Sequence, residues 1–146
     1  MARKYGKYIV TELRRNVALP TWSGNIHPAE KGSGGRVLYL DSEIVPGSFY
    51  LDCAWSVPGE FPKPGGIGTK PHTHDYDEVL CFFGSNPDDF HDLGGEVEFW
   101  LGDEKFMITK SCIIFIPKGL QHCPLMIHRV DRPIFHFSTG PGKMYF

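Results

Sequence analysis

The sequence lacks the features that would place the chain in a membrane or on nucleic acid. It has no run of 18 apolar residues, so no transmembrane helix is predicted. Fifteen basic residues oppose 17 acidic ones, and a net charge of −2 gives no electrostatic reason to expect nucleic acid or anionic lipid as a partner. No apolar segment follows the basic N-terminus, so no signal peptide is predicted. We therefore expect a cytoplasmic protein.

Paired cysteines of the kind that bind zinc or form redox motifs are also missing. The four cysteines are dispersed along the chain without a Cys-x-x-Cys pair, at Cys53, Cys81, Cys112 and Cys123. Three of them lie within apolar runs, where a free cysteine behaves as a small hydrophobic residue. We therefore expect reduced cysteines and no zinc–thiolate site.

Helical periodicity is absent as well, because no stretch longer than about ten residues repeats its apolar positions with the spacing of an amphipathic helix. The chain instead contains short apolar or alternating segments that are separated by Gly and Pro turns. They lie at residues 8–10, 37–40, 48–56, 79–83, 96–101, 106–108, 112–116, 122–130 and 134–139. A set of about ten short strands predicts an all-β sandwich or barrel.

The length of 146 residues fits one domain with a sizeable hydrophobic core. Residues 1–35 are mixed in character and contain glycine-rich loop segments, whereas strand-like patterning begins at residue 36. We therefore expect an N-terminal arm, residues 1–35, that packs on a β-barrel formed by residues 36–146.

The strongest chemical signal lies in residues 71–78. His72 and His74 are two positions apart, and alternate side chains of an extended strand point to the same face, so both imidazoles are expected to enter one pocket. Glu78 follows four residues after His74 and offers a carboxylate oxygen to the same pocket. Asp75 and Asp77, between them, are expected to be solvated turn residues.

A third histidine, His122, directly follows a Pro-x-Gly turn, in which Pro117 at i+1 and Gly119 at i+3 suit a type I turn. Three imidazoles and one carboxylate together predict a site for one divalent transition metal ion. This donor set suits Fe(II), Mn(II), Ni(II) or Zn(II) better than Ca(II) or Mg(II).

These two motifs resemble those of the cupin superfamily. The first motif is matched by Gly66, His72, His74 and Glu78, and the second by Pro117, Gly119 and His122. The resemblance covers residues 66–126 and implies a double-stranded β-helix, or jelly-roll barrel, with the metal inside. Departures from the family pattern, none of them a ligand, occur at Gly84, Ser111 and Met126. The motifs specify the fold and the metal site, and they do not specify a reaction.

Four protein ligands leave two open positions on an octahedral ion, which favours chemistry over a closed structural site. Our first hypothesis is a metal-dependent enzyme that acts on a small organic molecule, with a dioxygenase as first choice. An isomerase or decarboxylase of an oxo-acid or sugar derivative is the alternative reaction. A non-catalytic module that binds a small molecule is the alternative class, and a structural or storage barrel is least favoured.

Two further residues are candidates for the cavity or the surroundings of the metal. His136 is polar within an apolar strand, so it either satisfies a buried partner or faces the cavity. Met126 closes the second motif and is expected to shape the pocket. His91 and His128 are expected to have no part in the site.

A homodimer is expected from the patterning of two strands. Residues 79–83 and 113–116 are apolar at consecutive positions, so both faces of these strands require burial. One face of a barrel wall points inward, and the other must be covered by the N-terminal arm or by a second subunit.

Overall fold

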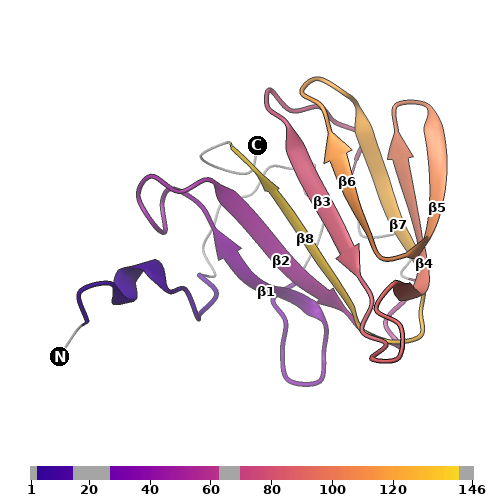
Figure 1. Cartoon of the computed structure of the whole chain (residues 1–146), viewed down its shortest axis with the longest axis horizontal. Helices are drawn as coiled ribbons and strands as arrows, with labels where there is room; N and C mark the ends of the chain where they lie inside the picture. Colours follow the sequence, from indigo (N-terminus) through magenta and orange to yellow (C-terminus); the bar gives the residue numbers. More distant parts are fainter. Residues whose placement is uncertain (1–2, 15–26, 63–69, 142–146) are drawn as a thin grey trace.

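The computed structural model describes residues 3–14, 27–62 and 70–141 (Figure 1). These residues form eight strands: β1 (Gly35–Leu40), β2 (Tyr50–Ser56), β3 (Glu78–Phe83), β4 (Asp92–Leu101), β5 (Glu104–Lys110), β6 (Cys112–Ile116), β7 (His122–Val130) and β8 (Ile134–Gly140). The described residues contain no α-helix, and nothing among them is helical, long and apolar enough to cross a membrane. The strand expected at residues 8–10 is not formed: Tyr8 ends a short 3₁₀ turn, η1 (Gly6–Tyr8), and residues 9–10 belong to no regular element.

The strands form two antiparallel sheets. One has five strands in the order β1-β2-β8-β3-β6, and the other has three in the order β5-β4-β7 (Figure 1). The last strand, β8, lies between β2 and β3, so segments far apart in the sequence are neighbours in space. The predicted all-β jelly roll is thus confirmed, and the four cysteines are free as predicted.

The main hydrophobic core combines inward-facing side chains of both sheets. Leu80 and Phe82 of β3 are buried together with Val97 and Phe99 of β4. Side chains alternate between the two faces of a strand, and Glu78 has the same parity as Leu80 and Phe82. The first residue of β3 is therefore a carboxylate that faces the interior, and its side chain is only 1% exposed.

A bulge in β7 sets the direction of His122. Phe99 pairs with Leu125, whereas Leu101 pairs with His122, so β7 contains one residue more than β4 over this interval. The extra residue reverses the alternation, and His122 and Leu125 both face the interior although their numbers differ in parity. Cys123, inside the bulge, has a φ of 73°, in the left-handed region.

Candidate metal centre

The main chain brings the two histidine segments together. The His72 N–H donates to the His122 carbonyl oxygen at 3.1 Å, and the His122 N–H donates to the His72 carbonyl oxygen at 3.0 Å. The Gly119 N–H donates to the His74 carbonyl oxygen at 3.0 Å. His72 therefore lies in a one-residue β-bridge and His74 in the loop that follows, not in the regular strand that their spacing predicted.

The Pro-x-Gly turn differs from the prediction by one residue. The Leu120 N–H donates to the Pro117 carbonyl oxygen at 3.0 Å, so Gly119 occupies position i+2 of the turn. Its φ of 83° is the value that a type II turn requires there, and glycine adopts it without strain. Asp77 accepts a hydrogen bond from the Lys118 N–H at 2.8 Å, and Asp75 lies 3.0 Å from Lys118 Nζ. Both aspartates are exposed and attach this turn to the histidine segment.

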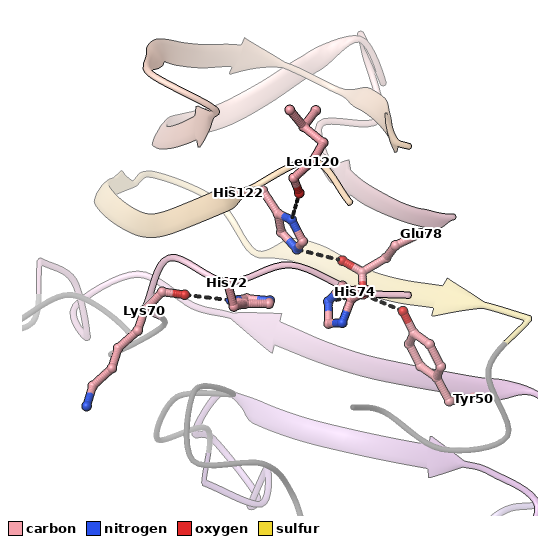
Figure 2. Close-up of polar contacts among 7 residues, drawn as sticks. All are labelled: Tyr50, Lys70, His72, His74, Glu78, Leu120 and His122. Atoms are coloured by element: carbon pink, nitrogen blue, oxygen red, sulfur yellow. Dashed lines mark hydrogen bonds and ion pairs between the residues drawn. The ribbon is translucent and has the colours of Figure 1, made fainter. Parts of the chain in front are cut away.

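The side chains of His72, His74 and His122 converge beside Glu78 (Figure 2). One nitrogen from each histidine lies within 4.8 Å of those of the other two. Glu78 Oε2 is 3.2 Å from His74 Nε2, and Glu78 Oε1 is 3.3 Å from His122 Nε2. His74, Glu78 and His122 are buried, whereas His72 is partly exposed at the edge of the cluster.

The hydrogen bonds of two imidazoles fix where their protons lie. His72 Nδ1 is 2.5 Å from the Lys70 carbonyl oxygen, and His122 Nδ1 is 3.0 Å from the Leu120 carbonyl oxygen. A carbonyl oxygen only accepts hydrogen bonds, so each Nδ1 must carry the proton. In a neutral imidazole the other nitrogen, Nε2, then presents a lone pair, and both lone pairs are available to a metal ion.

The pKa values of His72 and Glu78 are shifted toward the forms that bind metal. Burial, with the neighbouring His122 and His74, lowers the pKa of His72 to about 4, although its bond to the Lys70 carbonyl opposes this. Burial acts to raise the pKa of Glu78, but contacts with His122, His74 and Tyr50 outweigh it and bring the value to about 2. A neutral imidazole and an ionised carboxylate are the ligating forms of these side chains.

The spacing of the donor atoms also fits one ion. Two ligand atoms at right angles around an ion, each about 2.1 Å from it, lie about 3 Å apart. The 3.3 Å from Glu78 Oε1 to His122 Nε2 is close to this spacing, and His74 Nε2 lies 3.2 Å from the other oxygen of the same carboxylate, Oε2. Gly66, the remaining residue of the first motif, lies outside the described residues.

His136 and Met126 occupy different faces. His136 has the same parity as the core residue Ile134, so it faces the interior, where its ring stacks on Phe82 and its Nδ1 lies 3.2 Å from the Cys81 carbonyl oxygen. It is not a member of the three-histidine group. Met126 pairs with Glu98 and shares the outer face of the three-stranded sheet, so the structure does not bring it to the pocket that was expected.

Two tyrosines at the site were missed by the sequence analysis. Tyr50 of β2 is fully buried, and its hydroxyl donates a hydrogen bond to Glu78 Oε2 (Figure 2). Tyr76 stacks on the ring of His74, with centroids 4.9 Å apart. Tyr76 stands inside the first motif and was open to detection there, whereas Tyr50 is 28 residues from Glu78 and no local pattern connects them.

Comparison with known proteins finds similar solved structures but no similar sequences. No protein-family model matches the sequence, and no curated protein matches it. A solved structure of recombinant oxalate oxidase in complex with glycolate is similar, with a TM-score of 0.51 and 13% identity, over 96% of this chain and 62% of that one. Identity this low shows a shared fold alone.

Two other solved structures are similar at lower scores. An RmlC-like cupin from Shewanella frigidimarina NCIMB 400 has a TM-score of 0.44 and 13% identity, over 83% of this chain and 86% of that one. Oxalate oxidase in complex with the substrate analogue glycolate has a TM-score of 0.48 and 14% identity, over 81% of this chain and 55% of that one. The chain thus spans less than two thirds of either oxalate oxidase.

Proposed function

We propose that this chain, whose fold is that of the cupin superfamily, is a metal-dependent enzyme that acts on a small organic molecule. The proposed ligands are His72, His74, Glu78 and His122. The observation that carries the proposal is their convergence, with both Glu78 oxygens 3.2 to 3.3 Å from a histidine nitrogen in a buried cluster. Fe, Mn, Ni or Zn fits this donor set.

A dioxygenase is the first choice of reaction. A divalent ion with two open positions supplies Lewis-acid chemistry and a meeting point for substrate and dioxygen. The chain contributes the rest: main-chain hydrogen bonds between the two histidine segments fix the ligands, and burial of His74, Glu78 and His122 excludes bulk water. His72 is the one partly exposed residue among the four proposed ligands, and we propose that a substrate approaches from its side.

The alternatives use the same site. An isomerase or decarboxylase of an oxo-acid or sugar derivative needs the Lewis acid but no dioxygen, and a binding protein needs only the open positions. The similarity to oxalate oxidase concerns the fold, so the choice among these functions rests on the donor set and on experiment.

Elemental analysis of the purified protein, followed by oxygen uptake with a panel of small carboxylic acids and phenols, tests the proposal. Iron or manganese at one ion per chain, together with substrate-dependent oxygen uptake, supports the dioxygenase. Zinc or nickel without uptake favours the isomerase or the binding protein. A protein that retains no divalent metal and binds none on addition overturns the metal site.

We also propose a homodimer formed by the outer face of the five-stranded sheet. In the strand register three rows of side chains cross this face: Trp55, Phe135 and Phe83; Cys53, Phe137, Cys81 and Ile113; Leu51, Thr139, Val79 and Phe115. None of them is charged, so a charged partner finds no complement here. A second copy of the same apolar face is complementary to it, because two copies related by a twofold axis present the same surface to each other.

Within residues 3–14, the described part of the N-terminal segment, Tyr8 and Val10 lie at one end of this face. Tyr8 and Val10 line a hollow together with Leu38 and Leu51, over β1 and β2. Ile113 and Phe115 of β6, at the opposite edge of the sheet, are 68% and 58% exposed. We propose that a second copy covers the β8, β3 and β6 end.

The free thiols fit a reducing compartment, and we propose the cytoplasm as the location.

A further inference from the structure

The ring of Tyr50 crosses a strand to reach the proposed metal centre. Tyr50 on β2 pairs with Gly140 on β8, and Val79 pairs with Thr139, so Glu78 lies on the far side of Gly140. A Cβ atom on Gly140 would lie only 3.1 Å from Tyr50 Cε1 and 2.9 Å from the Asp77 carbonyl oxygen. The absence of a side chain at this position therefore leaves the space through which the tyrosine ring passes.

The surroundings of Tyr50 hold the ring in place. It is fully buried in a second hydrophobic cluster with Tyr39, and the edge of its ring meets Tyr76 with centroids 5.7 Å apart. Tyr76 in turn stacks on His74 at an interplanar angle of 17°. Two of the proposed ligands, His74 and Glu78, are thus supported by one pair of tyrosines.

The two oxygens of Glu78 have different surroundings. Oε2 accepts the hydrogen bond of the Tyr50 hydroxyl and lies 3.2 Å from His74 Nε2. Oε1 lies 3.3 Å from His122 Nε2. A rotation that turned both oxygens toward one ion would break the hydrogen bond between Glu78 Oε2 and a fully buried hydroxyl, which is unfavourable.

We propose that Tyr50 is a positioning residue that restricts Glu78 to ligation through one oxygen, Oε1, and thereby keeps a second coordination position open. This inference rests on the proposed metal site. With three imidazoles and one carboxylate oxygen, an octahedral ion retains two positions for exogenous ligands. If both oxygens bind, only one position remains, and a substrate that needs two is excluded.

Tyr39 provides a matched control within the same cluster. It is 2% exposed, and its hydroxyl donates at 2.9 Å to Asp41 Oδ2, which belongs to another buried carboxylate. Tyr39→Phe and Tyr50→Phe therefore each remove one hydroxyl that donates to a buried carboxylate. Only Tyr50→Phe removes a contact to a proposed ligand, so the comparison separates positioning of the metal from general stability.

The experiment uses the full chain loaded with Co(II), whose visible spectrum reports coordination. Azide serves as a probe that needs one open position, and acetohydroxamate as a chelating probe that needs two. We expect wild type and Tyr39→Phe to bind both probes. Tyr50→Phe should retain azide binding, lose affinity for acetohydroxamate by about tenfold or more, and show a changed Co(II) spectrum before any probe is added.

The outcomes distinguish the inference from the proposed function. If wild type binds no Co(II), the metal site fails and the inference fails with it. If Tyr50→Phe matches wild type in its spectrum and in its affinity for both probes, the inference is overturned and the metal site stands. An equal loss of both probes also overturns it. If Tyr50→Phe does not fold, Gly140→Ala is the second variant: its Cβ would crowd the Asp77 carbonyl oxygen at 2.9 Å and the Tyr50 ring at 3.1 Å, so the hydroxyl is kept but shifted relative to Glu78, and the same selective loss is expected.

Discussion

His72 and His122 form a reciprocal main-chain pair, with N–H to carbonyl distances of 3.1 and 3.0 Å. Because these bonds use no side-chain atom, either imidazole can be removed without separating the two segments. We expect His122→Ala to lower metal affinity by more than the roughly 10- to 100-fold that loss of an outer partner costs. The β-type circular dichroism signal should remain, since a core of this size does not depend on one ion.

His128 is the control for this prediction. It lies on the same strand, β7, but its Nε2 is 2.9 Å from Glu98 Oε1, away from the cluster. We expect His128→Ala to keep the metal affinity of wild type in a competitive titration. Loss of the β signal in His122→Ala, or an equal loss of metal in both variants, would contradict the assignment.

Glu78→Gln tests the charge of the ligand set at nearly constant size. Three neutral imidazoles should still hold a divalent ion, while the site becomes more positive by one charge. The acidity of bound water and the electron density on the metal should then change. For an oxygenase we expect oxygen uptake to fall far more than metal content, because a less electron-rich metal reduces dioxygen less readily.

Other results for Glu78→Gln have distinct meanings. For a binding protein, the affinity for its small molecule should stay close to that of wild type. An equal loss of metal and activity would show that Glu78 chiefly anchors the ion. Unchanged metal content with unchanged activity would remove it from the ligand set.

The strand pattern and the convergence of the four candidate side chains could be predicted from local sequence because both depend on short-range spacing. Alternation in residues 48–56 and 96–101 predicted β2 and β4, and the spacing of the two motifs selected the four residues that converge. Strand ends were less predictable. β4 begins at Asp92 and β5 at Glu104, which is four and two residues before the patterns that indicated them.

The direction in which the β7 side chains point could be determined only from the three-dimensional structure. Met126 was expected at the pocket because it closes the second motif, and alternation counted from His122 would also give it the parity of an inward residue. The bulge between His122 and Leu125 reverses the parity and turns Met126 outward. Pro124 was the available signal, because proline within a strand usually marks an edge or a bulge.

Contacts between strands that are far apart in the sequence could not be predicted either. Tyr50 contacts Glu78 because β8, which begins 78 residues after β2 ends, inserts between their strands and carries Gly140 at the crossing point. Nothing in the local sequence around any of these three residues indicates that contact.

The buried ion pair of Arg36 and Asp52 gives a prediction about stability. Arg36 Nε and Nη2 donate to the two oxygens of Asp52 at 2.7 and 2.8 Å, and their side chains are only 11% and 8% exposed. We expect Asp52→Leu alone to lower the free energy of unfolding by about 3–5 kcal/mol, because it leaves a buried charge without its partner. Urea denaturation measures this.

Replacement of both partners should restore most of the loss. With Asp52→Leu and Arg36→Met combined, neither charge of this pair remains, and the stability should return close to that of wild type. The surface pair of Lys118 and Asp75 is the control, since these side chains are 64% and 91% exposed. Lys118→Met should leave the urea midpoint unchanged. If the double variant is no more stable than Asp52→Leu, the ion pair is not the origin of the effect.

His136 gives a prediction about pH. Burial lowers its pKa below the ordinary 6.5; Asp52 of β2, the Cys81 carbonyl and Glu78 of β3 oppose this, and Arg36 of β1 adds to it. The folded chain therefore keeps this imidazole neutral at a pH where the unfolded chain protonates it. Its contribution to stability is full above about pH 6.5 and is lost as the pH falls from there through the lowered pKa.

His136→Gln should remove this part of the pH dependence and keep a side-chain donor at the same position. We expect the free energy of unfolding of metal-free wild type to fall more between pH 7.5 and pH 5.5 than that of the variant. Urea unfolding at the two pH values measures both. Equal decreases in the two proteins would show that His136 does not contribute.

The last prediction concerns the uncovered end of the five-stranded sheet. Phe115 is 58% exposed on the outer face of β6, next to Val79 in a row of uncharged side chains. Burial of such a surface against a second copy is favourable in proportion to the apolar area removed from water, and a carboxylate within that surface would lose hydration without gaining a partner.

We therefore expect wild type to sediment as a dimer at micromolar concentration and Phe115→Glu to sediment as a monomer. Met107→Glu, on the outer face of β5 in the other sheet at 44% exposure, is the matched control and should remain dimeric. A monomeric wild type would mean that no second copy is needed and that residues 1–35 provide the cover, whereas dissociation by both substitutions would place the interface elsewhere.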